Sequence, residues 1–158
     1  MKLLDMEVNE IRSAVIVNPV NCVGVMGKGL AKVMKSIYPW AFDDYVKKCK
    51  SNGLRPGEIV VSTHPQTLIE FEQPPPVIIH AATKDHWRNK TKIEWINSVL
   101  KQLDEFMTNS PLNTIAIPKL GCGLGGLSWD LQVKQLFEQI FSNVDYDVIV
   151  FDKPTEEE

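Results

Sequence analysis

The chain has 158 residues, of which 44% are hydrophobic and 23% are charged, and its net charge at pH 7 is −3. This length predicts one domain, residues 1–158, with its own core, and the negative charge excludes a general affinity for nucleic acid. The sequence has no run of 18 apolar residues, so we expect no membrane span, and we recognise no secretory leader. The three cysteines are far apart in sequence, which argues against a disulfide framework or a structural zinc site. We expect a cytoplasmic monomer that contacts no membrane.

Strands and amphipathic helices alternate along the chain. We predict a short edge strand and a turn within residues 1–12, followed by strands at 14–17, 58–63, 77–82, 114–117 and 148–151. Apolar residues at helical spacing predict helices at 30–38, from 39 to about 52, at 93–107 and after residue 128. This alternation indicates a three-layer α/β domain with helices on both faces of the sheet.

Two segments are predicted to lie outside this core, which would span residues 14–151. Residues 64–76 form a surface excursion, because the three prolines at 74–76 cannot donate to a strand ladder. Residues 154–158 form a frayed acidic tail.

Two helix starts carry a capping signature. Thr91 and Glu94 are spaced as in a capping box, in which the threonine hydroxyl accepts a hydrogen bond from the first turn of the helix. Ser128 is predicted to be the N-cap of the last helix, whose apolar face carries Val133 and Phe137.

Two glycine-rich loops follow predicted strands and lead into helices. The first glycine loop, residues 22–29, has glycines at 24, 27 and 29, and the second glycine loop, residues 121–127, has glycines at 121, 123, 125 and 126. Free backbone N–H groups at a helix N-terminus can bind a phosphate, although isolated glycines also serve only as turns. Together the two loops favour a nucleotide diphosphate, bound beyond the carboxyl ends of the strands.

Neither loop fits a standard nucleotide fingerprint. Residues 121–126 match GxGxxG, but only one strand follows them, which is too few for a dinucleotide-binding half-domain. Residues 27–29 lack the Ser or Thr that must follow the lysine of a P-loop. An NAD site is therefore weakly indicated, and a metal-dependent NTPase is not supported.

Three polar residues near the strand ends are candidates for binding a sugar. Lys84 follows an apolar strand, where partial desolvation could lower its pKa and free its lone pair, but most lysines are simply exposed. Asn18 and Asn21 can donate hydrogen bonds to sugar hydroxyls or can cap their own turn.

A basic and aromatic segment follows Lys84. It contains His86, Trp87, Arg88 and Lys90. Cations beside an aromatic ring are typical of single-stranded nucleic acid binding, and equally of a solvated helix start. We treat these four residues as candidates for contacting DNA.

The sequence from about residue 14 to 150 resembles the macrodomain family. The resemblance rests on VNPVN at residues 17–21, on the first glycine loop, and on PKLGCGL at residues 118–124. Residues 20–29, 83–88 and 120–127 together resemble the DarG-like branch, antitoxins that remove ADP-ribose from DNA, and are also similar to the terminal ADP-ribose glycohydrolase of animal cells. This resemblance implies an α/β/α fold with a mixed, six-stranded sheet that binds ADP-ribose across its carboxyl edge, without a metal or cofactor.

The resemblance also implies roles for individual residues. Lys84 matches the lysine on which this branch depends, which acts at the anomeric carbon as a nucleophile or as a proton-transfer and electrostatic group. Asn21 would face the distal ribose as a second catalytic residue, and the two loops would hold the diphosphate. The other implied contacts with ADP-ribose are Glu7, Asn18, Cys22, Val23, Gly24, Val25, Met26, Gly27, Gly29, Leu30, Thr83, Pro118, Leu120, Gly121, Cys122, Gly123, Leu124 and Gly125.

The sequence departs from the family pattern at two positions. Glu7 stands near the place where macrodomains usually carry an aspartate that holds the adenine amine. At the position where the animal enzyme has an acidic residue, this chain has Gly125, and DarG-like sequences also have a glycine there. The resemblance therefore supplies no carboxylate partner for Lys84.

The leading interpretation is a metal-independent glycohydrolase that cleaves ADP-ribose from a nucleobase of single-stranded DNA. One alternative is a non-catalytic ADP-ribose reader. Another is a hydrolase that acts on ADP-ribose 1''-phosphate, O-acetyl-ADP-ribose or protein-linked ADP-ribose, because the fold and the diphosphate loops are common to all of these. The implied partner is a cognate DNA ADP-ribosyltransferase toxin, and a phage protein that counters such a pair would look the same.

Overall fold

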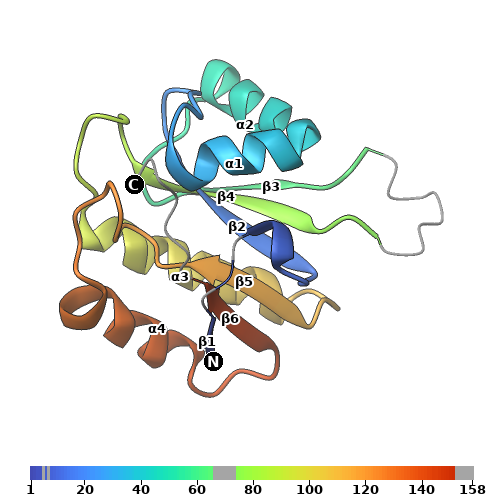
Figure 1. The fold of residues 1–158 in the computed structure, drawn as a ribbon, viewed down its shortest axis with the longest axis vertical. Coiled ribbons are helices and arrows are strands. Elements are labelled where there is room, and N and C mark those ends of the chain that lie inside the picture. The colour runs from blue at the N-terminus through green and yellow to red at the C-terminus, as the bar shows by residue number, and fades with distance from the viewer. Residues whose placement is uncertain (5, 7, 66–73, 152–158) are drawn as a thin grey trace.

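Six strands form one mixed sheet in a computed structural model that describes residues 1–4, 6, 8–65 and 74–151 (Figure 1). The strands are β1 (Lys2–Leu4), β2 (Val15–Asn21), β3 (Ile59–Ser62), β4 (Val77–Lys84), β5 (Thr114–Pro118) and β6 (Asp147–Phe151). Their order is β1-β6-β5-β2-β4-β3. All neighbouring strands are parallel except β3, which runs antiparallel to β4.

Helices cover both faces of this sheet, which confirms the predicted three-layer arrangement. Helices α1 (Gly29–Ile37) and α2 (Pro39–Ser51) lie on one face, and α3 (Ile93–Thr108) and α4 (Lys134–Phe141) lie on the other (Figure 1). A short 3-10 helix, η1 (Val8–Glu10), contacts α1, and a π-helical turn, η2 (Trp129–Val133), leads into α4. No helix in the described ranges is long and apolar enough to cross a membrane.

The core lies on both faces of the central strands. Along β2, Val15 and Val17 pack with α3 and α4, whereas Ile16 packs with α1, and all three side chains are at most 1% exposed. This burial explains why the parallel strands appear in the sequence as continuous apolar runs. The edge strand predicted near the N-terminus is confirmed as β1.

Two local predictions are corrected by the structure. β2 does not end at Val17 but continues to Asn21, and Pro19 fits within it because the ladder with β5 covers only Val15 and Ile16. The capping box is wrong: Lys92 is the N-cap of α3, and it makes no side-chain capping bond. The Ser128 cap is confirmed, since its hydroxyl accepts a hydrogen bond from the Leu131 N–H at 3.1 Å.

Other predictions fall partly beyond what the structure describes. Within the predicted excursion at 64–76, residues 66–73 lie outside the described residues, and so does the predicted acidic tail at 154–158.

The chain changes direction in the sheet between β2 and β5. After β2 it enters α1 on one face, and after β5 it enters η2 and α4 on the opposite face. Such a switch point opens a crevice at the carboxyl ends of the strands. The two glycine loops follow these two strands, so they border the same crevice.

Candidate active site

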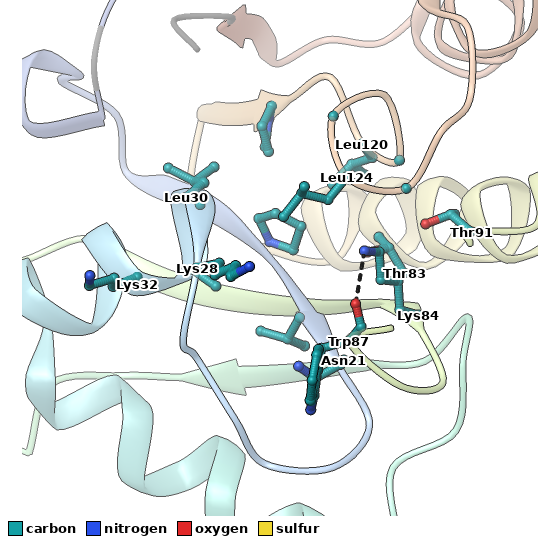
Figure 2. A pocket seen from close by; sticks show the side chains of 18 of the residues that line it. Asn21, Lys28, Leu30, Lys32, Thr83, Lys84, Trp87, Thr91, Leu120 and Leu124 are labelled. Carbon is teal, nitrogen blue, oxygen red and sulfur yellow. Dashed lines mark hydrogen bonds between the residues drawn. The ribbon is translucent and has the colours of Figure 1, made fainter. Parts of the chain in front are cut away.

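A cleft of about 1460 Å³ opens between the two glycine loops (Figure 2). Its wall comes from the end of β2, the start of α1, the end of β4, the residues before α3 and the second glycine loop. This volume exceeds the roughly 300–1,000 Å³ of an ordinary small-molecule pocket. The cleft therefore has room for a ligand larger than an ordinary small molecule.

Most residues that the sequence predicted for the site line this cleft. Those predicted for ADP-ribose or catalysis are Asn21, Val25, Gly27, Gly29, Leu30, Thr83, Lys84, Pro118, Leu120, Gly121, Cys122, Gly123, Leu124 and Gly125. Those predicted for DNA are Trp87, Arg88 and Lys90. The predicted residues that do not line it are Asn18, Cys22, Val23, Gly24, Met26 and His86. Glu7 lies outside the described residues.

Asn18 points into the layer of α1 and α2 and away from the cleft. Because side chains alternate along a strand, Asn18 shares the face of Ile16 and Val20 once β2 continues to Asn21. Its Nδ2 lies 3.2 Å from His80 Nδ1 and 3.8 Å from Met26 Sδ. Asn18 therefore lies beneath the first glycine loop as part of its support.

His80 is the centre of this buried support. Its ring is 1% exposed, and burial lowers its pKa to about 4, so the ring is neutral at pH 7. Nε2 lies 3.0 Å from the carbonyl oxygen of Ala41 and 3.1 Å from the Ser62 hydroxyl. The ring thus links β4 to β3 and to the start of α2.

Asn21 and Tyr45 hold the first glycine loop in shape. Oδ1 of Asn21 accepts a hydrogen bond from the Val23 N–H at 3.0 Å, and Nδ2 donates one to the Val25 carbonyl at 2.8 Å. The buried Tyr45 hydroxyl lies 2.7 Å from Oδ1 and 2.8 Å from the carbonyl oxygen of Asn21, and it accepts from the Gly24 N–H at 3.1 Å. Val25 O uses one hydrogen of the Asn21 amide, which leaves the second available at the cleft wall.

Cys22 and Met26 belong to the core beside Tyr45. They pack in one cluster with Val20, and burial raises the pKa of the Cys22 thiol to about 12. Cys22 is therefore a protonated packing residue at neutral pH and not a nucleophile.

The second glycine loop is shaped by main-chain bonds and tight packing. The Leu127 N–H donates to the Gly121 carbonyl at 2.9 Å, and the Thr91 N–H donates to the Gly125 carbonyl at 3.0 Å. A Cβ at Gly125 would lie 2.4 Å from Thr91 Oγ1 and 2.6 Å from the Gly121 oxygen. An acidic side chain at position 125, as in the animal enzyme that the sequence resembles, therefore has no room here.

Lys84 carries its amine into the cleft from the last residue of β4 (Figure 2). Asn21 and Lys84 occupy paired positions on neighbouring strands, so both catalytic candidates lie at one point of the sheet edge. Lys84 Nζ donates a weak hydrogen bond to the Trp87 carbonyl at 3.4 Å. Burial, and then the neighbouring Lys90 ammonium, lower the pKa of Lys84 below its ordinary value of 10.5.

The charges of the cleft wall are all positive among the described residues. The lining side chains include no Asp or Glu, although the whole chain has a net charge of −3. The lining cations are Lys28, Lys32, Lys84, Arg88, Lys90 and Lys119. Such a wall attracts polyanions, and in the described part of the chain it offers no carboxylate for acid–base catalysis. No group of three or more His, Cys, Asp and Glu side chains in that part could hold a metal ion.

The segment after Lys84 forms a turn at the mouth of the cleft, and hydrogen bonds within residues 85–89 hold it in shape. Asp85 accepts hydrogen bonds from the His86 N–H at 2.8 Å and from Asn89 Nδ2 at 3.0 Å, and these bonds lower its pKa. The Trp87 ring is 45% exposed, with the Arg88 guanidinium 4.7 Å from its centroid. An aromatic face beside cations suits a nucleobase with its adjoining phosphate.

Two residues with a part in the site were missed in the sequence. Tyr45 lies within the predicted helix from 39 to about 52, whose apolar spacing does not mark it as a site residue. A buried tyrosine hydroxyl nevertheless needs a polar partner, which here is the first glycine loop. Thr91 was taken for a helix cap, but its side chain lines the cleft. The signal for Thr91 is long-range, because it depends on the contact with Gly125.

The fold and the two-loop cleft define a macrodomain. The family model for the Macro domain matches residues 17–136, and the chain belongs to this family. It is 36% identical over 137 residues to a DNA ADP-ribosyl glycohydrolase of Mycobacterium tuberculosis, which covers 86% of this chain and 37% of the relative. A protein of the same name from Thermus aquaticus is 36% identical over 124 residues, covering 78% of this chain and 33% of the relative. The chain thus spans about a third of the length of these curated relatives.

Solved structures show the same arrangement. The macrodomain of Thermus aquaticus DarG superposes with a TM-score of 0.84 and 32% identity, covering 96% of this chain and 97% of that one. Thermosipho africanus DarTG in complex with ADP-ribose gives a TM-score of 0.78 and 30% identity, covering 88% of this chain and 38% of that one. The macrodomain fold implied by the sequence is confirmed.

Proposed function

We propose that this chain is a glycohydrolase that releases ADP-ribose from nucleobases of single-stranded DNA. The observation that carries the proposal is the position of the Lys84 amine, in a cleft whose described wall has six cations and no carboxylate. Relatives that are 36% identical to this chain over about a third of their own length are named DNA ADP-ribosyl glycohydrolase, and a similar structure is a complex with ADP-ribose.

Each part of the cleft would bind a different part of the ligand. The two glycine loops offer main-chain N–H groups to the diphosphate, and α1 begins at the first of these loops with its N-terminal N–H groups uncapped by a side chain. Asn21 and Lys84 take the distal ribose at the paired ends of β2 and β4. Trp87 and Arg88 at the mouth take the attached nucleobase and its strand.

The reaction is a hydrolysis at C1 of the distal ribose. The bond between C1 and the nucleobase nitrogen breaks, the hydroxyl of water ends on C1, and a proton ends on the base. Lys84 acts in one of two ways. In the first, its neutral amine attacks C1 and expels the base, the resulting N-glycoside opens to a Schiff base, and water then releases ADP-ribose and restores the amine. In the second, its ammonium transfers a proton to the leaving base and stabilises charge while water attacks C1. A lowered pKa favours the first route because it raises the fraction of neutral amine.

The test is release of ADP-ribose from an ADP-ribosylated single-stranded oligonucleotide by the wild type and by Lys84→Ala. We expect a loss of at least about 10³-fold in rate, which corresponds to roughly 4 kcal/mol of transition-state stabilisation. Lys101→Ala is the control, because Lys101 is exposed on α3 and does not line the cleft. Equal rates for the wild type and Lys84→Ala would remove the lysine from the mechanism.

The pH dependence of the rate separates the two roles of Lys84. If the neutral amine is the nucleophile, the rate rises with pH through a pKa below 10.5, and borohydride traps ADP-ribose on Lys84. If the ammonium is the active form, the rate falls over the same range and nothing is trapped.

The substrate class is tested with four ligands side by side. These are ADP-ribosylated DNA, ADP-ribosylated protein, ADP-ribose 1''-phosphate and O-acetyl-ADP-ribose. We expect the fastest turnover on DNA, and Trp87→Ala should slow that substrate more than the small ones. Binding of ADP-ribose without turnover of any of the four would identify a reader instead.

A DNA ADP-ribosyltransferase is the partner that this activity requires. A relative from Thermosipho africanus, 34% identical over 122 residues, is named a fusion of DNA ADP-ribosyl transferase and DNA ADP-ribosyl glycohydrolase. Co-expression of this chain with such a transferase should restore growth of the host cell, and Lys84→Ala should not. Equal toxicity with and without the wild-type chain would contradict the pairing.

A further inference from the structure

Thr91 carries a buried hydroxyl that no described residue satisfies. The residue is 5% exposed, and its Oγ1 has no hydrogen-bond partner in the described part of the chain. Buried hydroxyls in folded proteins are nearly always paired, because an unpaired one has lost its water without compensation. An exception of this kind calls for a state of the protein in which the hydroxyl is paired.

The hydroxyl is not used by the helix that follows it. Lys92 is the N-cap of α3 and makes no side-chain capping bond, so the local role that Thr91 could have played is absent. The Thr91 N–H instead donates to the Gly125 carbonyl at 3.0 Å, which fixes the residue against the second glycine loop. The side chain is thereby held at the cleft and not at the helix start.

The Thr91 Oγ1 atom lies on the same side of the cleft as Lys84. Figure 2 shows the hydroxyl of Thr91, which lies just before α3, pointing toward the side of the cleft that holds Lys84. Thr91, Lys84 and Gly125 all line the cleft. Gly125 has no side chain, and an added Cβ there would be 2.4 Å from Oγ1. The hydroxyl therefore lies directly against the main chain of the second glycine loop.

We infer that Thr91 is a binding residue, whose hydroxyl pairs with an oxygen of ADP-ribose when the second glycine loop adjusts around the ligand. The oxygen belongs to the diphosphate or to a hydroxyl of the distal ribose, since the proposed binding mode places both beside this loop and Lys84. The inference rests on the proposed ligand but not on the proposed reaction. It adds a contact from the start of α3 to a site otherwise built from strand ends and loops.

The experiment compares Thr91→Val with Thr91→Ser by calorimetric titration of ADP-ribose and of ADP, together with thermal unfolding of the free protein. Valine keeps the shape and removes the hydroxyl, so we expect an unchanged or higher Tm and an affinity for ADP-ribose about 10-fold weaker. Serine keeps the hydroxyl and removes the methyl, so we expect a lower Tm and wild-type affinity. The two variants thus separate a role in ligand binding from a role in packing.

The two ligands identify the oxygen. A loss shared by ADP and ADP-ribose assigns the contact to the diphosphate, and a loss seen only with ADP-ribose assigns it to the distal ribose. Wild-type affinity of Thr91→Val for both ligands, or a loss that appears only together with a lower Tm, would overturn the inference. A wild type that binds ADP-ribose but does not release it from DNA would refute the proposed function and leave this inference standing.

Discussion

The two glycine loops border one cleft, yet they are held in shape by different means. The first glycine loop depends on side chains, since Tyr45 and Asn21 together bond to Val23, Gly24 and Val25. Two of its glycines have room around them, since the nearest atom to an added Cβ is 3.7 Å away at Gly24 and 3.6 Å away at Gly27, although φ is +86° at Gly24 and +60° at Gly29.

The second glycine loop depends on the absence of side chains. A Cβ added at Gly121 would lie 2.9 Å from Leu127 Cδ1, and one added at Gly125 would lie 2.4 Å from Thr91 Oγ1. Gly121 also has a φ of +77°. Its internal bonds are main-chain bonds, such as Gly126 N–H to Gly123 O at 3.1 Å. The first loop is therefore sensitive to the removal of distant side-chain atoms, and the second to the addition of a single methyl group.

Among changes to the two loops, the largest effect is expected from Gly125→Ala. The new methyl would overlap Thr91 Oγ1 and the backbone oxygen of Gly121, so the loop must shift or open. We expect a loss of about 3 kcal/mol in the free energy of unfolding and on the order of 100-fold in affinity for ADP-ribose. Urea denaturation and calorimetric titration measure the two.

The matched change in the first loop is Gly27→Ala. Gly27 does not have a positive φ, and an added Cβ makes only an ordinary contact with Val25. The free energy of unfolding should change by less than about 1 kcal/mol. Equal destabilisation by the two variants would remove the distinction between the loops.

The sequence predicts those parts of the site that follow directly from where the strands end. The glycine loops and Lys84 were found because each follows an apolar strand, and strand ends of a parallel sheet share one edge. The direction of the Asn18 side chain depends on where β2 ends. The sequence does not show this, because the four residues after Val17 include a proline and two asparagines, which are not typical of a strand. Because side chains alternate between the two faces of a strand, the face on which a residue lies is known only when the strand is known to include it.

Long-range contacts account for the remaining differences. Thr91 fits a capping box by local spacing, but its N–H is bonded to Gly125, which lies 34 positions later. Tyr45 reaches Asn21 across 24 positions. Neither pairing has a local pattern, since both depend on how α2 and the second glycine loop are placed against the sheet.

A smaller effect is expected from acid, and it should reach the first loop before the second. The pKa of His80 is about 4 in the folded chain and 6.5 when the side chain is free. Its contribution to stability is therefore complete above pH 6.5 and is lost as the pH falls toward 4, by about 2 kcal/mol at pH 5. Asn18 connects the ring to Met26 of the first loop.

Urea denaturation between pH 7.5 and 5 measures this loss, and His80→Gln is the control because it lacks the titrating ring. Hydrogen exchange should show the Gly24 amide losing protection at pH 5 while the Leu127 amide, bonded within the second loop, keeps it. A wild type and a His80→Gln variant with the same pH dependence would exclude His80 as the cause.

The loss expected from Tyr45→Phe is smaller than that from acid. The change removes one oxygen, which bonds to Asn21 and to the Gly24 N–H, and leaves the ring in the core. We expect a loss of about 1 kcal/mol in the free energy of unfolding, because the buried partners lose a hydrogen bond. The affinity for ADP-ribose should fall by roughly 5-fold, since a loosened Asn21 must be ordered again on binding.

Tyr146→Phe is the matched control for this change. Its hydroxyl donates to Asp104 at 2.6 Å and neither residue lines the cleft, so its loss should cost similar stability and no affinity. If both tyrosine variants bind ADP-ribose like the wild type, the Tyr45 hydroxyl stabilises the fold without organising the first glycine loop for its ligand. The comparison therefore tests whether the side chains beneath the first loop act on ligand binding.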